Sequence, residues 1–83
     1  MLKERMQSIG KKAYVYLADD KTGERFLEQA EREGFRFGDG ALPTSRQFEE
    51  IMAIYPEGYI CYVGTYGRIA YQCSSVNKLD YFG

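Results

Sequence analysis

The stretch "AYVYLADDKTGERFLEQAEREGFRF", from Ala13 to Phe37, predicts a strand, a helix and a second strand in succession. Its first six residues alternate between two sets of side chains and are rich in β-forming types, which is typical of a strand. One set is expected to point toward the core and the other, with the tyrosines, away from it. The expected core set is Ala13, Val15 and Leu17, and the opposite set includes Tyr14 and Tyr16.

A helix of about three turns is expected to follow, from Thr22 to Glu33, after Asp19 and Asp20 end the strand. Its apolar stripe is formed by Phe26, Leu27 and Ala30. Gly34 is the natural residue to end the helix, because glycine readily adopts the left-handed conformation found there. The segment 35–37 is expected to be a short strand.

A second helix is predicted downstream, within "PTSRQFEEIMAIYP". Thr44 and Gln47 fit a capping box, in which each side chain bonds a free backbone N–H at the helix start. The apolar residues that follow keep the spacing of one buried helical face. They are Phe48, Ile51, Met52 and Tyr55.

The stretch "YICYVGTYGRIAYQC" predicts a β-hairpin, with 59–63 paired to 68–73 through a turn at Gly64–Gly67. A last strand is expected at 78–82. The sequence therefore indicates an α+β fold in the order β-α-β-α-β-β-β. Two helices would pack on one face of a mixed or mostly antiparallel sheet of four to five strands.

A chain of 83 residues is expected to form one domain, over residues 13–83. Residues 1–12 are expected to be a lead-in arm, with Leu2, Met6 and Ile9 at helical spacing. The arm could dock loosely on its own domain or pack as a short amphipathic helix on another subunit.

Composition excludes several classes of function. A net charge of −1 argues against extended binding of nucleic acid, which needs clustered lysine and arginine. The chain contains no histidine, and its two cysteines have no zinc-binding spacing, so no catalytic residue, metal or cofactor is predicted. No apolar run approaches a membrane span, and the first residues lack a signal peptide's apolar centre. We expect a cytoplasmic protein with free thiols.

The tyrosines are the candidate site. In the predicted hairpin, Tyr62 and Tyr71 share the open face of the sheet with the tyrosines of the first strand. Such a face could be ordinary cross-strand packing, or it could be an amphipathic platform for another copy, a host protein or a stacked base. Loop residues beside the platform complete the candidate set. That set is Tyr14, Tyr16, Tyr62, Tyr66, Tyr71, Arg68 and Asp39.

The run from Phe35 to Tyr71, with its "FRF", "GDG", "PTS" and "ICYVG" segments, resembles small proteins of unknown function carried by phages and prophages of Firmicutes. The resemblance implies no activity and no catalytic residue. It implies a phage accessory role in the host cytoplasm, such as counter-defence by blocking a host protein or sequestering a small anionic nucleotide.

Two functions from different classes follow. The first is a non-enzymatic binding protein that acts through the tyrosine face and the adjoining glycine loops. The second is a small structural or assembly protein whose tyrosine face forms a homo-oligomer. An enzyme is disfavoured, because acid-base chemistry would rest on carboxylates alone.

Overall fold

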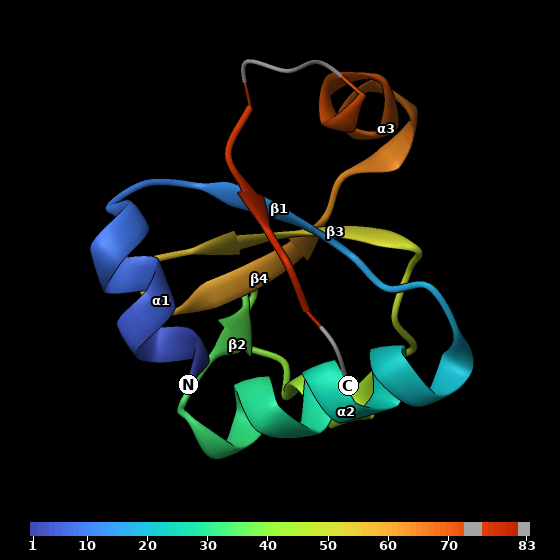
Figure 1. The fold of residues 1–83 in the computed structure, drawn as a ribbon. Helices are drawn as coiled ribbons and strands as arrows, with labels where there is room; N and C mark the ends of the chain where they lie inside the picture. Colours follow the sequence, from blue (N-terminus) through green and yellow to red (C-terminus); the bar gives the residue numbers. More distant parts are fainter. Residues whose placement is uncertain (73–75, 82–83) are drawn as a thin grey trace.

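The computed structural model describes residues 1–72 and 76–81, and within them five strands form one mixed sheet flanked by helices (Figure 1). The fold class is therefore α+β, as predicted. The elements are α1 (Leu2–Ile9), β1 (Ala13–Tyr16), α2 (Asp20–Arg32), β2 (Arg36–Phe37), the 3-10 helix η1 (Pro43–Ser45), β3 (Ile51–Tyr55), β4 (Tyr59–Tyr62), α3 (Gly64–Tyr71) and β5 (Lys78–Leu79).

The strand order is β2-β4-β3-β1-β5. The three central strands are antiparallel to one another, whereas the short outer strands β2 and β5 pair in parallel with β4 and β1. Met52 in β3 lies between Val15 and Tyr62, and Ala53 lies between Tyr14 and Cys61. Because side chains alternate along a strand, these two rows mark the opposite faces of the sheet.

Helices α1 and α2 cover one face, and α3 lies on the other side of the sheet (Figure 1). Leu2 and Met6 of α1 are buried in the same cluster as Phe26 of α2 and Val15 of β1. The segment 1–12, expected as an arm, thus places two side chains in the hydrophobic core of its own chain.

The stretch that opens with Ala13 forms the elements predicted for it. Ala13, Val15 and Leu17 are buried, whereas Tyr16 is exposed. Asp19 caps α2, since its Oδ1 accepts a hydrogen bond of 2.8 Å from the Thr22 N–H.

The predicted second helix from Thr44 to Tyr55 is wrong. Only 43–45 is helical, as the single 3-10 turn η1, and 51–55 is the strand β3. The predicted capping box is absent from the structure, because Thr44 donates through both its N–H and its hydroxyl to Glu31 of α2 instead. Four of the five residues of β3 are fully or almost fully buried, because the core covers one face of the strand and α3 lies on the side of its other face.

The predicted hairpin of 59–63 with 68–73 is also wrong. Strand β4 pairs with β3 through the turn at Pro56–Gly58, and Gly58 has the positive φ (110°) that this turn requires. The residues expected to return as a strand form α3, which begins at Gly64. The predicted order of elements after β2 is therefore incorrect, and Cys73 lies outside the described residues.

In the part of the chain that the structure describes, no helix is long and apolar enough to cross a membrane.

Candidate functional site

Three tyrosines and a lysine gather on the face of the sheet opposite α1 and α2. Tyr14 comes from β1, Tyr55 from β3 and Tyr59 from β4, and the register places Tyr55 directly opposite Tyr59. The Tyr55 and Tyr59 rings stack, with centroids 4.6 Å apart and planes 28° apart. The Lys12 Nζ lies 4.9 Å from the centre of the Tyr14 ring and 5.8 Å from that of Tyr55. We call these four residues the aromatic face.

The cation of Lys12 is stabilised by its neighbours. A side-chain hydrogen bond with Tyr14 raises the pKa of Lys12, despite the opposing effect of burial. Partial burial, followed by the neighbouring Cys61, raises the pKa of Tyr55. The Lys12 ammonium therefore keeps its charge and the Tyr55 phenol stays neutral at pH 7. This arrangement suits cation–π and hydrogen-bonding contacts.

A second pair of rings lies between β1 and α3. The centroids of Tyr16 and Tyr71 are 6.1 Å apart, and the Lys78 Nζ lies 4.6 Å from the centre of the Tyr71 ring. Tyr66 and Ile69 on α3 are 88% and 60% exposed. The apolar surface on this side of the sheet thus continues from the strands onto α3.

The structure separates the predicted site residues into groups. Tyr14, Tyr16 and Tyr71 lie on the side of the sheet opposite α1 and α2, although Tyr71 belongs to α3 and not to a strand. The prediction that Tyr62 shares the open face is wrong. Tyr62 lies on the face that carries the core, where its ring is 5.3 Å from that of Phe37 and its hydroxyl donates to the Gln47 carbonyl oxygen at 2.5 Å.

The charged residues of the predicted site are engaged in ion pairs and lie apart. Asp39 follows β2 and pairs with Arg46 at 2.6 Å. Arg68 lies on α3 and contacts Glu50 at 3.4 Å. Hydrogen bonds from Arg46 and from the Ala41 N–H lower the pKa of Asp39, so its carboxylate is ionised at neutral pH. Neither pair lies among the rings of the aromatic face.

Sequence reasoning missed Tyr55, Tyr59 and Lys12. The helical spacing of 48–55 predicts Tyr55 on a buried helical face, and only the continuous apolar run "IMAIY", taken as a strand, places it on a sheet with Ile51 and Ala53. Among the described residues, no group of three or more His, Cys, Asp or Glu side chains could hold a metal ion.

Comparison of the chain with models of protein families, with curated proteins and with solved structures finds no match in any of the three.

Proposed function

We propose that the protein is a small non-enzymatic binding protein, and that the aromatic face is its contact surface for a protein partner. The observation that carries the proposal is that Tyr59 of the aromatic face is 39% exposed, and that the same side of the sheet also carries the exposed rings of Tyr16 at 42% and, on α3, Tyr66 at 88%. Tyrosine is enriched at the centre of protein interfaces, because it supplies a large contact area with few rotatable bonds and a hydroxyl that can remain hydrogen-bonded.

The proposed mode of action is occlusion of a host protein by a phage accessory factor. The resemblance to phage and prophage proteins that the sequence suggests for the segment 35–71 would imply a partner in the host cell. The thin core of so small a domain supports a role in binding, since it leaves much apolar surface outside the core. Lys12 would steer an acidic or aromatic partner, because its charge lies over two ring faces.

Strand β4 supplies a matched pair of variants for the test. Tyr59 and Tyr62 are both 39% exposed, yet they point to opposite faces of the sheet. Native mass spectrometry of protein purified from its cells of origin would compare the wild type, Tyr59→Ser and Tyr62→Ser. We expect a heteromeric complex that Tyr59→Ser weakens and Tyr62→Ser retains.

Two outcomes would contradict this proposal. A homodimer lost in Tyr59→Ser would favour the assembly protein over the host-binding protein. Equal loss of the complex in both variants would show that the aromatic face is not the contact surface. Thermal unfolding of each variant would separate loss of binding from loss of fold.

A further inference from the structure

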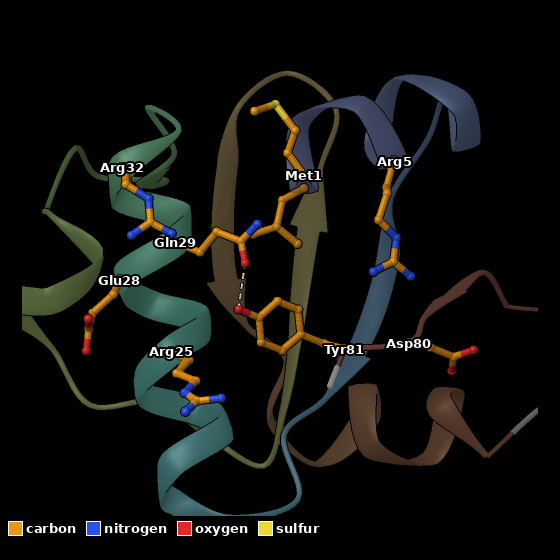
Figure 2. A pocket seen from close by; sticks show the side chains of 9 residues that line it. Met1, Arg5, Arg25, Glu28, Gln29, Arg32, Asp80 and Tyr81 are labelled. Carbon is orange, nitrogen blue, oxygen red and sulfur yellow. Dashed lines mark hydrogen bonds between the residues drawn. The ribbon is translucent and has the colours of Figure 1, made fainter. Parts of the chain in front are cut away.

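A pocket of about 540 Å³ opens between α1, α2 and the segment Asp80–Tyr81 (Figure 2). It lies on the side of the sheet that α1 and α2 cover, and none of the four residues of the aromatic face lines it. Pockets of a few hundred cubic ångströms are the size that small-molecule sites have in proteins. The inference drawn from it goes beyond the proposed function and does not depend on it.

Three arginines line this pocket from two helices. Arg25 and Arg32 lie two turns apart on α2, and Arg5 comes from α1 (Figure 2). Among residues 1–72 and 76–81, neither Arg5 nor Arg32 forms an ion pair. Two carboxylates, those of Glu28 and Asp80, also line the pocket, so positive charge is in excess there although the whole chain is slightly acidic.

Gln29 and Tyr81, which also line the pocket, are held in place by side-chain contacts. The Tyr81 hydroxyl donates to the Gln29 Oε1 at 2.7 Å, and the Gln29 Nε2 donates to the Glu33 Oε2 at 2.8 Å. The Tyr81 ring meets the Phe26 ring edge-on at 5.4 Å. These contacts join Gln29 and Tyr81 to the core. A ligand would therefore meet a largely preformed surface, which lowers the entropic cost of binding.

We propose that this pocket binds a small molecule that carries a phosphate group on a hydroxylated body, such as a nucleoside monophosphate or a sugar phosphate. Guanidinium groups match the geometry of phosphate oxygens and bond them in pairs. Glu28 and Asp80 accept hydrogen bonds from sugar hydroxyls. The volume exceeds what a bare phosphate needs, and the half-buried ring of Tyr81 offers an apolar contact to the body of the ligand.

The test is isothermal titration calorimetry of the full chain with AMP, ribose 5-phosphate, inorganic phosphate and adenosine. We expect saturable binding of at least one of the two phosphate esters, weaker binding of phosphate and none of adenosine. Preference between AMP and ribose 5-phosphate would show whether the base contributes. Affinity should fall as salt is raised, because the site acts by charge.

Two arginine variants and one charge-matched control complete the test. Arg32→Gln and Arg5→Gln should each weaken binding by about tenfold or more, because each removes a charged donor. Lys11→Gln removes the same charge outside the pocket and should leave binding unchanged. The proposal is overturned by a wild type that binds neither ester, by an affinity for both esters no higher than that for inorganic phosphate, or by equal losses in all three variants. Melting temperatures of the variants would confirm that each is folded.

Discussion

Gly23 is a buried residue of α2 whose missing side chain leaves room for a ring. A Cβ at this position would overlap the ring of Phe48, a half-buried residue that packs against the core from the segment before β3. In most helices, alanine is more favourable than glycine by about 1 kcal/mol. Here the helical preference and the close contact oppose each other.

We predict that Gly23→Ala lowers the free energy of unfolding by about 1–3 kcal/mol, the usual range for overpacking, despite its better helix propensity. Chemical denaturation measures the change. In a Phe48→Ala background, the same substitution should be neutral or stabilising, because the ring is gone. A stabilising effect in the wild type would mean that Phe48 does not occupy this position.

Single residues also show why some side-chain partners could not be predicted. Thr44 and Gln47 satisfy a local capping rule, but Thr44 bonds Glu31, which lies 13 residues earlier in the chain. Asp19, by contrast, caps the helix that its own sequence predicts. Local rules succeed where both partners lie within one turn, and they fail where tertiary packing supplies a competing acceptor.

Helix α1 is capped by a residue of another helix. Its first turn has no side-chain cap of its own, and the Glu33 carboxylate at the end of α2 accepts hydrogen bonds from the Leu2 N–H (3.0 Å) and the Lys3 N–H (2.8 Å). The four N–H groups at the start of a helix need such partners. Glu33 therefore attaches α1 to the rest of the fold.

Glu33→Gln should lower the free energy of unfolding by about 1 kcal/mol, the usual loss of an N-terminal cap. Hydrogen exchange should speed up selectively in the amides of α1. Glu24→Gln, an exposed change of the same chemistry on α2, is the control and should have little effect. Equal exchange rates in the two variants would show that the Glu33 contacts do not hold α1.

The loss of stability caused by Glu33→Gln should depend on pH in a defined direction. Partial burial raises the pKa of Glu33, but the hydrogen bonds from Lys3, Gln29 and Leu2 outweigh it and hold the folded-state pKa below its ordinary value near 4.5. A lowered folded-state pKa stabilises the protein above the unfolded-state pKa, and the stabilisation is lost as the pH falls through the folded-state value. The wild type and Glu33→Gln should therefore differ most at neutral pH and converge in acid.

The second half of the chain shows how an element can be misread. The apolar residues of 48–55 satisfy the helical period, but "IMAIY" is also a continuous apolar run, which is the pattern of a strand buried on both faces. The structure realises the second pattern, because β3 lies in the middle of the sheet. Once β3 is a strand, Pro56–Gly58 becomes a hairpin turn, β4 pairs with β3, and the residues from Gly64 are left to form α3.

The change of 51–55 from a predicted helix to a strand also determines which candidate residues lie together. Tyr14 and Tyr16 were placed correctly, because the alternation of their strand is unambiguous. Tyr62 was placed on the wrong face, because its orientation depends on the partner of β4. Tyr55 and Tyr59 meet only through the pairing of β3 with β4. The arginines of the pocket line one site only because α1 docks beside α2, which no local pattern indicates.

At the scale of the whole molecule, the class of the fold was predictable and its connectivity was not. Composition and the first strand–helix–strand unit suffice for an α+β domain. The position of β1 between β3 and β5 depends on pairings across about 40 and 65 residues. Which strands pair depends on how the whole face of one strand packs beside another and against the core. No short segment of a single sequence shows this.

The hydrophobic core joins segments that lie far apart in this small chain. Met6 of α1 and Met52 of β3 are both fully buried in one cluster, although 46 residues separate them. A domain of this size is stabilised by only about 4–12 kcal/mol in total, at the usual 0.05–0.15 kcal/mol per residue. Each large side chain in the cluster therefore accounts for a considerable part of the stability.

Met6→Ala should accordingly cost about 2–5 kcal/mol, the range for truncating a buried methionine, and should lower the melting temperature about as much as Met52→Ala does. Glu4→Ala, an exposed change on the same helix, should have little effect. Thermal and chemical unfolding of the three variants would measure this. If Met6→Ala is as mild as Glu4→Ala, α1 is a peripheral arm and the core is confined to the sheet and α2. A loss equal to that of Met52→Ala would instead show that α1 and the sheet unfold as one cooperative unit, because the same buried cluster then sets the stability of both.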